Sequence, residues 1–100
     1  GNFNPIELRT DKGALWENFL ISERMKQKEY KESLARSYFW RTIQQQEVDF
    51  VEESEGKIFG YEFKWQKKKN HKLPKTFTET YNAETSIIDK ENFREFVIIR

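Results

Sequence analysis

The chain has 100 residues, of which 36% are hydrophobic and 16% aromatic, so it is expected to form one small domain with an aromatic-rich core. It has no cysteine and one histidine, which excludes a disulfide scaffold, a thiol nucleophile, a cysteine zinc site and a multi-histidine metal site. No apolar run approaches the ~20 residues of a membrane span, and no signal pattern opens the chain, so we expect a cytoplasmic protein with no membrane contact.

The N-terminal third is predicted to contain one helix. Residues 1–10 hold Asn4-Pro5 and are expected to be an extended lead-in, followed by a single domain over residues 11–100. Thr10 or Asp11 is a suitable helix cap. Apolar residues from Ala14 onward recur at helical spacing, which predicts a helix that ends near residue 30.

The middle of the chain is predicted to form an antiparallel meander. Aromatic and β-branched residues over 37–43 indicate a first strand, and residues 46–52 its return. Ser54-Glu55-Gly56 indicates a turn into a third strand over residues 57–66.

The C-terminal part is predicted to begin with a basic loop and end in a helix. Pro74 suits the first turn of a helix that carries Phe77 and Tyr81. Residues 85–88 then indicate a short strand, and Asp89 is a suitable cap for a final helix. The element order is therefore α-β-β-β-α-β followed by a helix, which predicts an α/β fold. The chain also stops directly after an apolar stretch, so we expect it to be a fragment of a longer protein.

Four polar residues indicate a site. Glu17 lies in an apolar helical pattern, while Asp49 and Glu62 lie in aromatic-rich strand patterns, where an ionised carboxylate costs several kcal/mol unless it is compensated. A turn near residues 53–56 places Asp49 opposite residues 60–62, and alternation points Glu62 and Lys64 to the same face. Two converging carboxylates without cysteine or several histidines favour Mg²⁺ or Mn²⁺ as a cofactor.

This set of residues is suited to the cleavage of phosphodiesters. The cation bound by Asp49 and Glu62 would polarise the phosphate, and Lys64 would orient the attacking water and stabilise charge. Glu17 would supply a further ligand, directly or through water. A nucleic-acid backbone would be held by the lysines that follow the third strand, Lys67, Lys68, Lys69 and Lys72.

The pattern Glu17 … Asp49 … Glu62-x-Lys64 resembles the PD-(D/E)XK nuclease superfamily, and the helix glutamate is most similar to that of archaeal Holliday junction resolvases. The segments Lys12-Gly13-Ala14-Leu15-Trp16-Glu17-Asn18-Phe19, Tyr38-Phe39-Trp40-Arg41-Thr42 and Glu47-Val48-Asp49-Phe50-Val51 resemble the C-terminal domain of a family of AAA-type ATPases. The resemblance implies a restriction-endonuclease-like αβββαβ core with a mixed sheet flanked by helices. It also implies a Mg²⁺-dependent nuclease-like domain that acts on or binds DNA, attached to an ATPase module in the full-length chain. Val48 departs from the superfamily pattern, which has proline before the aspartate.

Simpler readings exist for each residue. Glu17 would favour the helix dipole, Asp49 and Lys64 would form a cross-strand ion pair, and the lysine cluster would be a solvated loop. Other residues are expected to be structural: His71 on the surface, Glu23 and Arg24 in surface pairs, and Trp16, Trp40 and Trp65 in or at the edge of the core. The alternative function is an inactive nuclease-fold domain that serves protein interaction or dimerisation as a homodimer. The net charge of +1 argues against a strong free-standing DNA binder.

Overall fold

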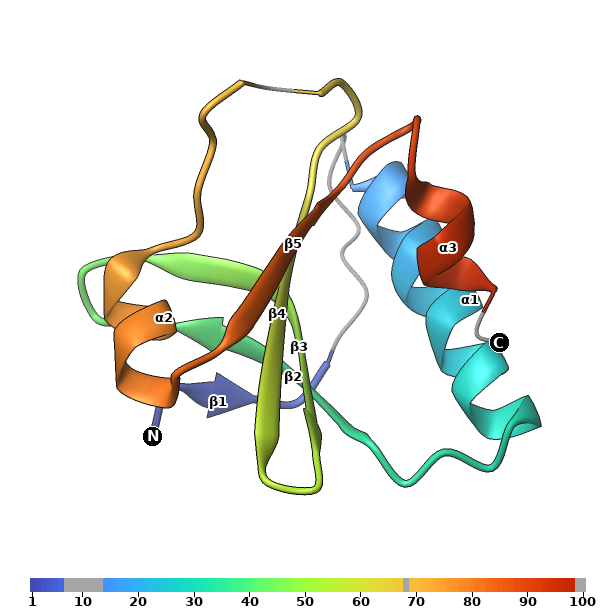
Figure 1. Cartoon of the computed structure of the whole chain (residues 1–100), viewed down its shortest axis with the longest axis horizontal. Helices are drawn as coiled ribbons and strands as arrows, with labels where there is room; N and C mark the ends of the chain where they lie inside the picture. The colour runs from blue at the N-terminus through green and yellow to red at the C-terminus, as the bar shows by residue number, and fades with distance from the viewer. Residues whose placement is uncertain (7–13, 68, 99–100) are drawn as a thin grey trace.

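A computed structural model describes residues 1–6, 14–67 and 69–98 of the chain. It shows an α/β domain in which a mixed five-stranded sheet is flanked by helices (Figure 1). In chain order the elements are β1 (Phe3–Asn4), α1 (Leu15–Tyr30), β2 (Arg36–Arg41), β3 (Glu47–Ser54), β4 (Lys57–Phe63), α2 (Lys75–Tyr81), β5 (Glu84–Ile88) and α3 (Phe93–Val97). In the described part of the chain, the helices are all too short or too polar to span a bilayer.

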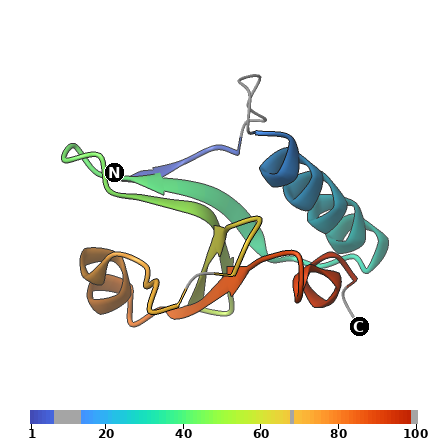
Figure 2. The same cartoon turned by 90° about the horizontal axis from the view of Figure 1, so that it is seen from above.

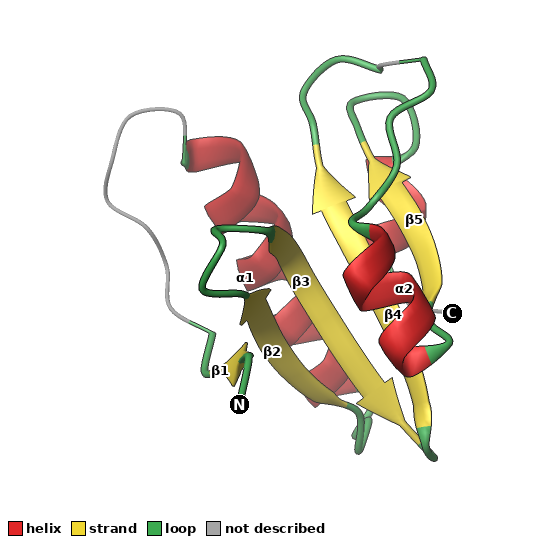
Figure 3. Ribbon diagram, turned by 90° about the vertical axis from the view of Figure 1, so that its left-hand side faces the viewer, coloured by secondary structure: helices red, strands yellow, loops and turns green. Residues whose placement is uncertain are grey.

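The strands lie side by side in the order in which they occur in the chain, from β1 to β5 (Figure 3). The pairs from β1 to β4 are antiparallel, and β4 pairs with β5 in parallel. A parallel neighbour requires a crossover connection, and the segment that contains α2 supplies it. Glu55 and Gly56 both adopt positive φ, which gives the tight β3–β4 turn.

Helices cover both faces of the sheet (Figure 2). Leu20 and Ile21 of α1 and Phe96 of α3 pack on one face, against Phe50 and Phe63. On the other face, Phe77 of α2 and Leu73 pack against a second group of buried residues, Trp40, Val48 and Val51. The strands β3, β4 and β5 thus contribute side chains to both apolar layers, which leaves little room for an uncompensated charge inside the sheet.

The predicted α-β-β-β-α-β order and the final helix are confirmed, with three differences in extent. The lead-in contains a strand, because Phe3 and Asn4 pair with Trp40 and Phe39 of β2. The third strand of the meander ends at Phe63 rather than at residue 66. Asp89 does not cap α3 directly: its carboxylate accepts the amides of Glu91 and Asn92 in the turn before the helix. The predicted caps Thr10 and Asp11 lie outside the described residues.

An irregularity in β3 decides which way Asp49 points. Tyr38 pairs with Val51 and Trp40 with Val48, so two steps along β2 are matched by three steps along β3. The extra residue is a β-bulge between Val48 and Val51. Both valines face α2, while Phe50 and Asp49 between them face α1. Strict alternation from Phe50 and Val51 would have placed the carboxylate of Asp49 on the α2 side. The bulge turns it toward the α1 side instead.

Candidate active site

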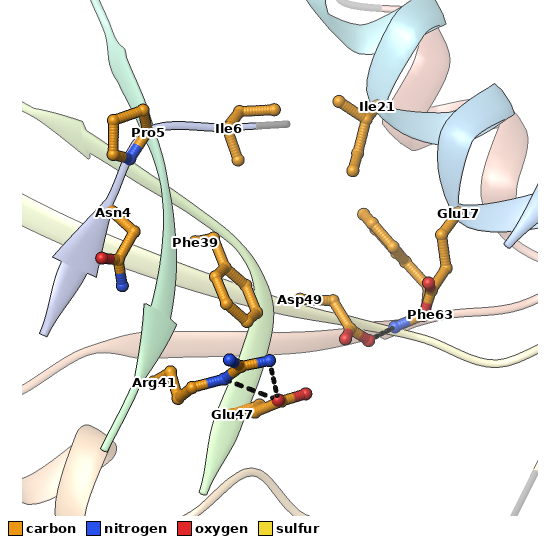
Figure 4. Close-up of a pocket in the computed structure, with 10 residues that line it drawn as sticks. All are labelled: Asn4, Pro5, Ile6, Glu17, Ile21, Phe39, Arg41, Glu47, Asp49 and Phe63. Atoms are coloured by element: carbon orange, nitrogen blue, oxygen red, sulfur yellow. Dashed lines mark hydrogen bonds and ion pairs between the residues drawn. The ribbon is translucent and has the colours of Figure 1, made fainter. Parts of the chain in front are cut away.

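A cleft of about 610 Å³ opens between α1, the bulged part of β3 and the segment that follows β1 (Figure 4). Glu17 of α1 and Asp49 of β3 both line it, together with apolar groups that include Ile21 and Phe39. At its other end Arg41 and Glu47 form an ion pair of 2.7 Å. The helix glutamate and the strand aspartate, which are 32 positions apart in the sequence, thus face one hollow, and the predominant charge along its wall is negative.

The carboxylate of Asp49 lies where β3 and β4 separate. The regular pairing of these strands extends to Phe50 and Tyr61. Beyond that point, Oδ2 of Asp49 accepts the amide of Phe63 at 2.8 Å, in place of a main-chain carbonyl. A strand amide that faces a neighbouring strand lies near the plane of the sheet. The carboxylate is therefore held in the fork between the two strands, and only one of its two oxygens is used by this bond.

The surroundings of Asp49 oppose its negative charge. The pKa of this carboxyl is raised from 3.8 to about 7, mainly because of burial and also because of the negative charges of Glu17 and Glu62. The amide of Phe63 and the positive charge of Lys64 act in the opposite direction. The other three predicted catalytic residues thus lie near enough to Asp49 to influence its protonation. A carboxyl that titrates near neutral pH because of burial and acidic neighbours is typical of functional sites.

Glu62 lies on the neighbouring strand and interacts with His71. Glu62 Oε2 hydrogen-bonds Nε2 of His71, which comes from the loop between β4 and α2. Gly60, two residues earlier, packs against Phe77 of α2, so alternation assigns Glu62 to the α2 side of β4. Glu62 therefore approaches the fork from the face opposite to Glu17, and Asp49, which is turned toward the α1 side, would share a cation with Glu62 only across the fork. That Asp49 and Glu62 share one cation stays a prediction.

The contact with His71 was missed from the sequence. The residue was expected to be an ordinary surface group, but its side chain is only 29% exposed and lies on a predicted site residue. No local pattern signals this contact, because the loop that carries His71 has no regular periodicity. The contact depends on how the crossover folds back over the end of β4.

Lys64 follows the last residue of β4 and is half-buried. Its backbone is fixed from two sides: its amide donates to the carbonyl of Ile88 at 2.8 Å, and its carbonyl accepts the indole N–H of Trp16 at 3.2 Å. Trp16 is one residue before Glu17 in α1. This hydrogen bond therefore couples the helix position of the glutamate to the strand position of the lysine.

The residues fit a small hard cation in part. Mg²⁺ is commonly bound through one or two carboxylates, with water and substrate phosphate as the other ligands. Asp49 and Glu62 are suitable oxygen donors, and their hydrogen bonds with Phe63 and His71 each occupy only one oxygen of the carboxylate. In the described residues, however, no three histidine, cysteine or acidic side chains come together to hold a metal. The donor set thus suits a site that needs solvent and substrate to complete it.

The predicted nucleic-acid contacts lie in the loop after β4. Lys67, Lys69 and Lys72 are exposed there, and Lys68 lies outside the described residues. Figure 1 shows that this loop extends beyond the same end of the sheet at which α1 begins. The three described lysines are therefore available to a polyanion at the end of the molecule where Lys64 is found.

The expectation of surface pairs for Arg24 is wrong. Its guanidinium forms a bidentate pair with Glu52 of β3, at 2.7 and 3.0 Å, and donates to the carbonyl of Phe96 at 2.7 Å. Burial disfavours the charge, but the hydrogen bond and charge of Glu52 raise the pKa of Arg24 above its ordinary value. Lys28 also reaches Glu52, at 3.6 Å. Glu23, in contrast, pairs with Lys26 one turn away, as expected.

Fold and site together define an α/β domain with an acidic cleft beside the fork of two antiparallel strands, and Lys64 follows one of these strands. The family described as Domain of unknown function (DUF4143) matches residues 12–98. The chain therefore belongs to this family. Comparison with curated proteins and with solved structures found no match.

Proposed function

We propose that the chain is a Mg²⁺-dependent nuclease-like domain of the PD-(D/E)XK type that acts on DNA. The observation that carries the proposal is the Asp49 carboxylate in the strand fork, with Glu17, Glu62 and Lys64 all close enough to alter its pKa. Support also comes from the order of α1, β2, β3, β4, α2 and β5, which is the αβββαβ order of that superfamily's core.

Each residue has a role in the proposed reaction. Asp49 and Glu62 would hold Mg²⁺, which when bound would polarise the scissile phosphate. Lys64 would orient the attacking water and stabilise the charge that develops on the phosphate oxygens. Glu17 would complete the cation site from the α1 side, and Lys67, Lys69 and Lys72 would bind the DNA backbone. In the full-length protein, we propose that an AAA-type ATPase module accompanies this domain.

The first test is the response of the fold to metal. Mn²⁺ or Mg²⁺ that binds the native state should raise the melting temperature as its concentration increases. Asp49→Asn is the matched variant, because its amide oxygen still accepts the Phe63 amide while the charge is lost. We expect the metal-induced rise in melting temperature to disappear in this variant. An equal rise in both proteins would place any metal elsewhere.

The second test is cleavage of branched and linear DNA in the presence of metal. We expect cleavage by the wild type and at least a hundredfold loss in Lys64→Ala, a typical effect of removing one charge-stabilising group. Lys57→Ala, at the exposed start of the same strand, is the control and should retain activity. Absence of cleavage together with absence of a metal response would contradict the proposal.

A second candidate is a nuclease-fold domain without activity, used for protein interaction or dimerisation. It is favoured by the lack of three converging metal donors in the described residues. A metal response without cleavage of any DNA would support this candidate over the first.

A further inference from the structure

A group of four aromatic side chains lies next to the candidate site and is only partly covered. This aromatic patch consists of Trp16 and Phe19 of α1, Trp65 after β4, and Phe93 of α3. Trp16 is at its centre: its ring centroid lies 4.9 Å from that of Trp65, 5.2 Å from Phe93 and 5.9 Å from Phe19. Trp65 remains 56% exposed and Phe19 42% exposed. Trp65 therefore lies at the edge of the core, which is one of the two expected positions, and more than half of it is exposed.

The indole of Trp65 is held in place although it is exposed. Its ring stands at 87° to that of Trp16, and its carbonyl accepts the amide of Lys90 at 3.1 Å. The ammonium group of Lys90 also lies 5.9 Å from the centre of the Trp65 ring. An exposed aromatic ring that is fixed in this way loses little conformational freedom when a flat partner stacks on it.

The segment of chain around and after Trp65 is strongly basic. Residues 64–78 contain six lysines and no acidic residue, and Trp65 lies between Lys64 and the loop that carries Lys67 and Lys69. Lys90 and Arg94 add positive charge beside Trp65 and Phe93. An aromatic platform beside a row of lysines matches the chemistry of a single-stranded nucleic acid, whose bases stack while its phosphates meet the cations.

We propose that the aromatic patch binds an unpaired stretch of DNA and stacks a base on Trp65, so that the substrate class of the site is DNA with a single-stranded segment. The inference rests on the proposed function and adds the feature of DNA that the site selects. Trp16 connects the two, since its ring contacts Trp65 while its N–H holds the carbonyl of Lys64. A base on Trp65 would thus place its own backbone within the reach of Lys64.

The experiment measures binding without cleavage. A labelled oligothymidylate and a blunt duplex of the same length are titrated in EDTA at low salt, and fluorescence anisotropy reports the affinity. We expect the single strand to bind more tightly than the duplex. We also expect it to quench the tryptophan emission. Trp65→Ala should weaken single-strand binding by about tenfold or more, and Trp65→Phe should restore most of it.

Two controls separate stacking from charge and from general loss of structure. Tyr30→Ala removes an aromatic ring that is 81% exposed at the opposite end of α1, and it should leave both affinities unchanged. Lys67→Ala should weaken binding of single strand and duplex alike, because a phosphate contact does not distinguish them. Melting temperatures of all variants identify any that are poorly folded, and Trp65→Phe serves as the variant that preserves the contact with Trp16.

Each remaining outcome is decisive. Equal or tighter binding of the duplex, or a Trp65→Ala variant with full affinity for the single strand, would overturn the inference. The proposed nuclease function would still stand if metal-dependent cleavage were observed. Tighter binding of an oligouridylate than of the oligothymidylate would replace DNA by RNA and overturn the assignment. Failure to bind any oligonucleotide, combined with no metal response at Asp49, would overturn both proposals.

Discussion

At the scale of single residues, Asp49 determines how the domain responds to pH. Its pKa of about 7 in the folded chain lies above the ordinary value of 3.8, so the native state binds more protons than the unfolded state between these pH values. The contribution of Asp49 to stability is then fully present below about pH 4 and is lost as the pH rises through about 7.

We therefore expect that, without metal, this contribution decreases by about 2–3 kcal/mol between mildly acidic and mildly basic pH. Urea unfolding in EDTA across this range gives the free energy of unfolding of the wild type and of Asp49→Asn. The asparagine variant should lack this part of the pH dependence, because it has no proton to release. Parallel pH profiles for the two proteins would show that the carboxyl titrates normally.

The order of the four polar residues predicted a site but not its geometry. The predicted register placed Asp49 opposite residues 60–62. In the structure the last regular pair is Phe50 with Tyr61, one residue before Asp49 along β3. The bond from the Phe63 amide and the contact of His71 with Glu62 were not predictable. Both depend on where a strand stops and how a loop returns, and periodicity carries no information on either.

At the scale of elements, Gly60 sets how closely α2 approaches β4. A β-carbon at this position would lie 2.4 Å from Cε2 of Phe77 and 3.2 Å from Cδ2 of Leu73. Because Phe77 is fully buried, its ring has little room to move away.

We expect Gly60→Ala to destabilise the domain by about 1–3 kcal/mol, the usual cost of overpacking. Thermal or urea unfolding measures the effect, with Lys57→Ala in the same strand as an exposed control. Adding Phe77→Leu should recover part of the loss, since a smaller side chain removes the clash. A Gly60→Ala variant as stable as the wild type would be incompatible with the packing of α2 on Gly60.

The elements themselves were largely predictable, because apolar spacing and turn residues mark them. The strand β1 was not predicted, since two residues are too few for any pattern and their pairing with Trp40 and Phe39 is long-range. The bulge was missed for a related reason: the sequence from Val48 to Val51 is equally compatible with a regular strand and with a bulged one. Its presence depends on the partner strand β2.

At the scale of the whole molecule, Arg24 connects three elements. Its guanidinium joins α1 to Glu52 of β3 and to the carbonyl of Phe96 in α3, and it lies 4.6 Å from the centre of the Phe96 ring. The side chains of Arg24 and Glu52 are only 14% and 6% exposed. Their separation in the sequence explains why local spacing favoured a surface pair instead.

We expect Arg24→Ala to lower the free energy of unfolding by about 3–5 kcal/mol, because it leaves Glu52 buried with one partner fewer. The triple variant Arg24→Met, Lys28→Met, Glu52→Leu should lose less than Arg24→Ala, since it leaves neither an unpaired carboxylate nor an unpaired ammonium group. Urea unfolding of both variants and of the exposed-pair control Lys26→Ala gives the comparison. A loss below about 1 kcal/mol for Arg24→Ala would class the contact with ordinary surface pairs.

Because of the bulge in β3, the number of residues between Val48 and Val51 determines which side chains face α1. With one residue fewer between Val48 and Val51, the two valines would pair with Trp40 and Tyr38 without a bulge, and the α1 face would lose either Asp49 or Phe50. Substitutions in this stretch are graded in their effect, whereas a single-codon deletion there is all or nothing. We therefore expect related chains to differ in the residues of this segment more than in its length.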